Sequence, residues 1–145
     1  MSTHLDDAGK AHMVDVTEKT ETTRVALAEG ELVAAPDVLA AIRQNSLKKG
    51  DALAVARVAG IMAAKNTSRV IPLSHDIPDG AYDIGFGLGE NTIRARCRAV
   101  SAARTGVEME AQQGVSMAHL TLYDRAKYIV KGMVIRNVRL LEKTG

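Results

Sequence analysis

A chain of 145 residues, 46% of them hydrophobic, is long enough to bury one core and too apolar to be disordered. Aromatic residues make up only 3% and include no tryptophan, which argues against nucleic-acid binding by base stacking. The formal net charge of +2 suits a small anionic ligand better than a polymer. One cysteine, no signal peptide and no apolar run long enough to span a bilayer predict a cytoplasmic protein without disulfides or a membrane segment.

One domain is predicted at residues 14–145, behind a mobile or partner-ordered arm at residues 1–13 that shows no hydrophobic period. A first strand is expected between residues 22 and 33, with a break at Gly30. A helix is expected from Pro36 through Ile42, because proline suits the first turn of a helix.

A longer helix is predicted to begin after Asp51, a suitable N-cap residue, and to end at Lys65. Its many alanines allow close packing against a sheet or a second helix. Lys48 and Lys49 precede this helix start, where backbone N–H groups also attract anions. Two interpretations of these lysines stay open at this point, a phosphate site and ordinary solvated side chains.

A short apolar run from residue 69 to residue 75 follows, and a polar turn at residues 76–80 places His75 at an exposed end of this element. A histidine in such a place is either an ordinary loop residue or a functional group.

Residues 81–88 and 91–100 are predicted to form a hairpin, in which Ile93, Ala95, Cys97 and Ala99 share one face. The opposite face carries three arginines that contact either solvent or a partner: Arg94, Arg96 and Arg98. A last strand is expected at residues 133–141. This order of elements indicates an α+β fold with helices packed on one face of an antiparallel sheet.

Between the hairpin and the last strand, apolar residues recur at steps of three or four, which predicts a long amphipathic helix within residues 106–131. The expected core face is formed by Val107, Ala111, Val115, Ala118, Leu122, Ala126 and Ile129. Asp124 and Lys127 lie off this face as i, i+3 neighbours, and Glu108 and Glu110 lie off it near the helix start. The Asp124–Lys127 pair is either an acid/base pair or an ordinary surface ion pair.

The sequence holds no HExxH or paired CxxC spacing and no nucleophile motif, so it offers no clear metal ligands and no covalent catalyst. Acid/base and electrostatic chemistry remain, and this mixture of cations and carboxylates suits a phosphorylated substrate. The candidate side chains are Lys49, Lys65, His75, Glu108, Glu110, Asp124, Lys127 and Lys131.

Six segments in collinear order resemble the signatures of the molybdenum cofactor biosynthesis protein C family. They are AHMVDV at 11–16, KKGD at 48–51, ARVAGIMAAK at 56–65, IPLSH at 71–75, TGVEMEA at 105–111 and LTLYDRAK at 120–127. The resemblance implies a ferredoxin-like α+β fold and a homohexamer, a trimer of dimers, with active sites at subunit interfaces. It also implies cyclic pyranopterin monophosphate synthase activity, in which a cyclised dihydro-GTP is rearranged to cyclic pyranopterin monophosphate with loss of pyrophosphate.

Carried over residue by residue, the family's Tyr-Asp-x-x-Lys motif makes Asp124 the acid/base residue and Lys127 its catalytic partner. The resemblance assigns the remaining site residues to substrate binding: Leu73, Ser74, His75, Met109, Glu110, Lys49, Lys65 and Glu108. No cofactor is certain and no metal-ligating residue is assigned, and Mg²⁺ carried by the triphosphate or pyrophosphate is left open.

Two departures from the family pattern favour a second hypothesis. Ser74-His75-Asp76 stands where the family usually has Cys-His-Pro, and the sequence ends at Gly145, where family members usually continue into a Gly/Lys-rich tail. Asp76 brings negative charge toward a triphosphate site. The alternative is therefore a divergent, non-catalytic oligomer of the same fold that binds a pterin or a nucleotide.

Overall fold

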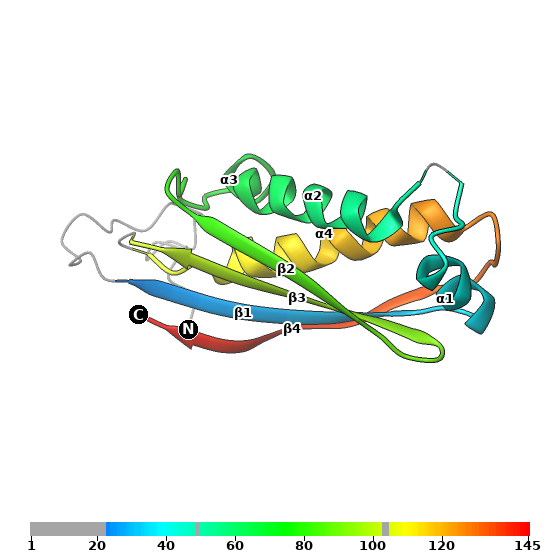
Figure 1. Cartoon of the computed structure of the whole chain (residues 1–145). Helices are drawn as coiled ribbons and strands as arrows, with labels where there is room; N and C mark the ends of the chain where they lie inside the picture. Colours follow the sequence, from blue (N-terminus) through cyan, green and yellow to red (C-terminus); the bar gives the residue numbers. More distant parts are fainter. Residues whose placement is uncertain (1–22, 49, 103–104) are drawn as a thin grey trace, which may run out of the picture.

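Antiparallel strands build one sheet, and two long helices cover one of its faces (Figure 1). This computed structural model describes residues 23–48, 50–102 and 105–145. The arm expected at residues 1–13, the start of the domain at residue 14, and Lys49 lie outside the described residues. The elements are β1 Arg24–Val33, α1 Pro36–Arg43, α2 Ala52–Lys65, α3 Thr67–Val70, β2 Ala81–Leu88, β3 Thr92–Ser101, α4 Glu108–Ala126 and β4 Val134–Thr144.

The strand order is β2-β3-β1-β4, and every neighbouring pair is antiparallel. With α2 between β1 and β2 and α4 between β3 and β4, this is the βαββαβ arrangement of ferredoxin-like folds. The α+β fold with helices on one face is therefore confirmed. None of the helices described here is long and apolar enough to cross a membrane.

The cap residue predicted for α2 and most of the apolar face predicted for α4 are found in the structure. The Asp51 side chain accepts a hydrogen bond of 3.1 Å from the Ala54 backbone N–H and so caps α2. Most of the predicted face of α4 is fully buried, since Ala111, Val115, Ala118, Leu122 and Ala126 have no exposed surface. The helix itself is shorter than the pattern, because it begins at Glu108 and ends at Ala126.

The predicted break at Gly30 is wrong, because β1 runs through this residue without interruption. A β carbon at Gly30 would lie 2.7 Å from Cγ1 of Val115 on α4. The pairing of β1 with β4 also shifts register between Glu29 and Glu31. Glycine is thus required here by the close approach of helix and sheet rather than by a chain break.

The sheet face that points away from the helices carries a cluster of arginines around a single carboxylate. Glu29 has a side chain only 9% exposed, and Arg96 Nε donates to its Oε1 at 2.8 Å. Arg94 and Arg139 approach the same carboxylate at 3.6 and 3.5 Å. The hydrogen bond from Arg96 lowers the pKa of Glu29, so this carboxyl stays ionised and its charge is compensated.

Gly60 on α2 faces Gly114 on α4 where the two helices pack against each other. A β carbon at Gly60 would lie 2.7 Å from the Gly114 carbonyl oxygen and would also overlap Ile84. Gly60→Ala should therefore destabilise the protein by about 1–3 kcal/mol, because backbone cannot move aside as a flexible side chain can. Urea unfolding at fixed protein concentration measures this change.

The matched control is Gly85→Ala, at a strand position where a β carbon would meet nothing within 4 Å. An equal loss of stability in both variants would contradict the close helix contact.

Candidate active site

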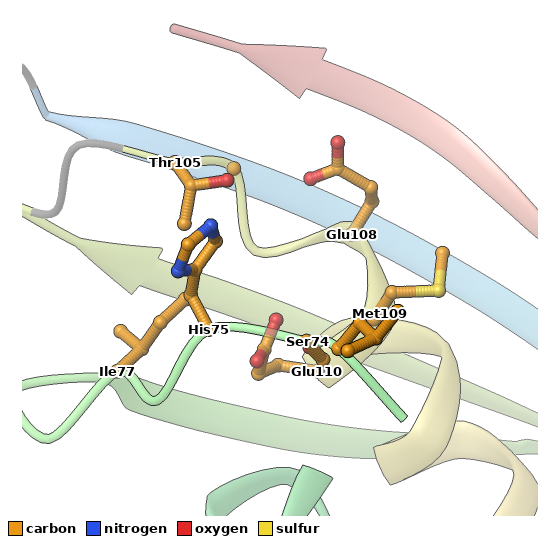
Figure 2. Close-up of a pocket in the computed structure, with 9 residues that line it drawn as sticks. Ser74, His75, Ile77, Thr105, Glu108, Met109 and Glu110 are labelled. Carbon is orange, nitrogen blue, oxygen red and sulfur yellow. The ribbon is translucent and has the colours of Figure 1, made fainter. Parts of the chain in front are cut away.

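A cavity of about 230 Å³ lies where the first turn of α4 meets the irregular segment between α3 and β2 (Figure 2). Its lining residues are Leu73, Ser74, His75, Ile77, Thr105, Gly106, Glu108, Met109 and Glu110. Six of the residues singled out in the sequence thus come together in space, although the two segments lie more than two dozen residues apart. The sequence did not identify Ile77, Thr105 and Gly106 as site residues.

Backbone strain marks the turn that delivers His75 to this cavity. Leu73 has a φ of 65°, in the left-handed region that a residue with a β carbon disfavours. The Ser74 backbone N–H then donates to the Ile71 carbonyl at 3.3 Å. Such strain persists only where the surrounding structure fixes it, and it concentrates at functional sites.

Glu110 is buried in the wall of the cavity, with 3% of its surface exposed. The prediction that it lies off the buried face of the helix is therefore wrong. Burial raises its pKa to about 7, and the negative charges of Glu108 and Asp76 act in the same direction. A carboxyl with this pKa can either donate or accept a proton near neutral pH.

Three buried polar atoms, two on residues that line the cavity and one on β2, lack a hydrogen-bond partner among the described residues. They are His75 Nε2, Tyr82 Oη and Glu108 Oε2. Burial raises the pKa of Tyr82 to about 12, so its phenol stays neutral and keeps a proton to donate. Buried groups of this kind normally have partners, and their pairing capacity remains available to a ligand.

A cation reaches the same region from β4. Lys143 Nζ lies 2.8 Å from Oε1 of Glu108, whose side chain is 25% exposed. Sequence patterns do not predict this contact, because Lys143 lies 35 positions after Glu108 and only the folded sheet brings β4 to the start of α4. Glu108 therefore uses one oxygen in an ion pair, while the other remains unpartnered.

The Asp124–Lys127 pair lies at the opposite end of α4. Lys127 Nζ is 3.1 Å from Asp124 Oδ1, and the two side chains are 63% and 58% exposed respectively. Positions 110 and 124 are 14 residues apart, or roughly 21 Å along the helix at about 1.5 Å per residue. Within one chain, Asp124 and Lys127 therefore lie outside the cavity that Glu110 lines.

Asp124 and Lys127 line two adjoining depressions of the surface. One, of about 530 Å³, is shared with Met117, Leu120, Thr121, Tyr123 and Arg125. The other, of about 210 Å³, is shared with Lys48, Arg125 and Tyr128. An exposed ion pair contributes only about 0.3–0.5 kcal/mol to stability. The position of the Asp124–Lys127 pair beside these depressions therefore says more about its role than its contribution to stability does.

Lys65 lies apart from both places, in a groove of about 610 Å³ between α2 and α4. Arg69 lines the same groove and provides a second cation that the sequence did not single out. Met117 lines both this groove and the depression beside Asp124. The two surfaces are therefore continuous along α4.

No three His, Cys, Asp or Glu side chains within residues 23–48, 50–102 and 105–145 gather closely enough to hold a metal ion. Mg²⁺ bound through the phosphates of a ligand would need no such group, because Mg²⁺ commonly binds to one or two carboxylates and to substrate phosphates.

Comparison with known proteins gives one consistent result over nearly the whole chain. Residues 13–145 match the MoaC family. A cyclic pyranopterin monophosphate synthase of Desulforamulus reducens is 50% identical over 144 residues, which cover 99% of this chain and 88% of the relative. The enzyme of the same name from Thermomicrobium roseum is 47% identical over 145 residues, covering 99% and 87% of the two chains. Cyclic pyranopterin monophosphate synthase 2 of Mycobacterium bovis is 50% identical over 142 residues, covering 98% and 85%.

The raised pKa of Glu110 makes the stability of the protein depend on pH. Its pKa rises from 4.5 to about 7 on folding, so the folded state binds more protons than the unfolded state between these values. Stability is therefore fully present below pH 4.5 and is lost as the pH rises through 7. Glu110→Gln cannot ionise and should be more stable than the wild type at about pH 8 by on the order of 3 kcal/mol.

Urea unfolding of both proteins across this pH range measures the difference, which should disappear toward the acid end. Glu142→Gln, at an exposed position on β4, is the matched control and should leave the pH dependence unchanged. Identical pH dependence for Glu110→Gln and the wild type would contradict the raised pKa.

Proposed function

Because the chain belongs to the MoaC family, we propose that it is a cyclic pyranopterin monophosphate synthase, a lyase of molybdenum cofactor biosynthesis. Its substrate is (8S)-3',8-cyclo-7,8-dihydroguanosine 5'-triphosphate, and its products are cyclic pyranopterin monophosphate and pyrophosphate. The observation that carries the proposal is the cavity at the start of α4. It gathers Leu73, Ser74, His75, Met109 and Glu110 from two distant segments, and the family resemblance assigns these residues to substrate binding.

The reaction requires proton transfers and the departure of a highly charged group. Asp124 is the proposed acid/base residue, and the ammonium of Lys127 stabilises negative charge that develops next to it. Glu110 is suited to a second proton transfer, since its pKa of about 7 lies near neutral pH. His75 supplies a further polar contact through its unpartnered Nε2 atom.

Cations at other positions fit the phosphate end of the substrate. Lys65 and its neighbour Arg69 face one groove, and an ammonium or guanidinium group there can pair with phosphate oxygens. Lys49 has the same proposed role by family resemblance. Mg²⁺, if it takes part, enters with the triphosphate, whose oxygens are its preferred ligands.

Two subunits are needed to complete one active site. A general base must lie within about 3 Å of the proton that it moves, yet Asp124 and Glu110 of one chain are roughly 21 Å apart along α4. We therefore propose a homohexamer, a trimer of dimers, in which a two-fold axis brings the end of one α4 to the start of its partner's.

Exposed apolar side chains on the helical face support this assembly. Val58, Met62 and Leu120 are 56%, 64% and 51% exposed. Val58 and Met62 belong to α2 and Leu120 to α4, the two helices that cover the sheet. Contact with a second subunit would remove this apolar surface from water.

Asp124→Asn tests the catalytic assignment. The substitution keeps the size of the side chain but removes the proton-transferring carboxylate, so turnover should fall by roughly two to four orders of magnitude. Lys127→Ala should lower kcat comparably, with a smaller effect on substrate binding. Thermal stability should change by only about half a kcal/mol in either variant, because the pair is exposed.

Stability, oligomer size and turnover are measured on the same preparations, so that loss of folding is separated from loss of chemistry. A folded Asp124→Asn oligomer with wild-type turnover would falsify the assignment.

Subunit mixing tests the shared site. Asp124→Asn and His75→Ala homo-oligomers should each be inactive or nearly so, because each lacks one half of every site. After dissociation and reassembly together, some interfaces will pair an intact Asp124 with an intact His75, and about a quarter of wild-type activity should return for random mixing. The control is each variant reassembled alone. No recovery in mixed oligomers of the correct size, or a stable monomer with full turnover, would exclude a shared site.

A further inference from the structure

The cleft at the C-terminal end of α4 holds more positive charge than the Asp124–Lys127 pair requires. Its five lining residues are Lys48, Asp124, Arg125, Lys127 and Tyr128. Three of these side chains are cationic and one is anionic, and Lys48 is a cation that belongs to neither the Asp124–Lys127 pair nor α4. A cleft lined by several cationic side chains favours an anionic ligand.

Lys48 is the lining residue that lies far in the sequence from the other four. It belongs to the segment between α1 and α2 and lies 80 residues from Tyr128 in the chain. The remaining lining residues follow one another at the end of α4 and just beyond it. Some interaction must therefore hold the segment of Lys48 against this helix end.

Tyr128 makes two contacts that do so. The backbone N–H of Lys48 donates a hydrogen bond of 3.0 Å to the Tyr128 hydroxyl oxygen. The Lys48 ammonium nitrogen also lies 4.8 Å from the centroid of the Tyr128 ring. A cation within about 6 Å of an aromatic ring is attracted by the negative charge density of its face. The same tyrosine thus fixes both the backbone and the charged end of Lys48.

Fixing the ammonium in advance has a direct consequence for binding. A solvent-exposed lysine loses rotamer freedom when it contacts a ligand, and a side chain that is already held in place loses less. Asp124 compensates Lys127 across 3.1 Å, so the charge of Lys48 adds to a cleft that is already partly neutralised. An ammonium in this position can donate charge-assisted hydrogen bonds to phosphate oxygens.

We propose that this cleft binds phosphate groups of the substrate and that Tyr128 is a positioning residue, which holds Lys48 in contact with them. The phosphates are those of the triphosphate named above, so this inference rests on the proposed function. Tyr128 itself touches no reacting atom, and its effect on the reaction passes through Lys48.

Calorimetric titration of the full chain with inorganic pyrophosphate tests the cleft without any turnover. Lys48→Ala should weaken binding about tenfold, the effect of removing one charge-assisted hydrogen bond. Tyr128→Phe keeps the ring and loses only the hydroxyl acceptor, so it should weaken binding about threefold. Tyr128→Ala loses both contacts and should approach the affinity of Lys48→Ala.

Lys131→Ala is the matched control. Lys131 was a candidate side chain in the sequence, but the structure leaves it exposed and outside the lining of the cavities and grooves described above. The substitution removes the same charge three residues from Tyr128. Pyrophosphate affinity should stay within about twofold of the wild type, because a charge outside the cleft is screened by salt.

Steady-state kinetics separate positioning from a general loss of structure. Lys48→Ala and Tyr128→Phe should raise KM and leave kcat nearly unchanged, whereas a merely structural role would lower thermal stability and the amount of active oligomer instead. If Lys48→Ala binds pyrophosphate as tightly as the wild type, and the wild-type protein turns over the substrate, the proposal of a phosphate-binding cleft is wrong and the proposed function stands. If the wild-type protein shows no turnover but the variants show the expected differences in pyrophosphate affinity, the proposed function is wrong and the cleft is an anion-binding site.

Discussion

The close packing of α4 against α2 and the sheet is the constraint on which the rest of the structure depends. Glycines permit it at both contacts, since Gly30 lies under Val115 and Gly60 lies against the Gly114 carbonyl. Side chains at these positions would push the helix away from the sheet. Because α4 is held along its length, the positions of both of its ends are fixed.

These two fixed ends carry different chemistry. The start of α4 is covered by the strained turn at Leu73 and buries the Glu110 carboxyl, whose pKa is raised by loss of water. The far end leaves Asp124 and Lys127 open to solvent beside cationic clefts. In the proposed assembly, a second subunit joins the buried proton-transfer group of one chain to the exposed ion pair of another. Oligomeric assembly is therefore part of the proposed mechanism rather than an addition to it.

Local patterns in the sequence predicted the elements well because each depends on neighbouring residues. The Asp51 cap, the alternation along β3 and the apolar stripe of α4 are of this kind. The burial of Glu110 could not be predicted, because the cavity also needs a segment more than two dozen residues away. The contacts of Lys143 with Glu108 and of Tyr128 with Lys48 also join residues that are far apart in the sequence, so local patterns do not reveal them. Position 119 lies four residues after Val115 and three before Leu122, on the buried side of α4, and only the polarity of His119 argued against its full burial.

A cyclic pyranopterin monophosphate synthase must perform a reaction rather than only bind a pterin or nucleotide. Incubation of the purified wild-type protein with the cyclised dihydro-GTP, followed by quantification of pterin product and pyrophosphate, tests for this reaction. Catalysis predicts that both accumulate in equal amounts until substrate is exhausted. Tight binding of the substrate with neither product formed would contradict it and would identify a non-catalytic binding protein of the same fold.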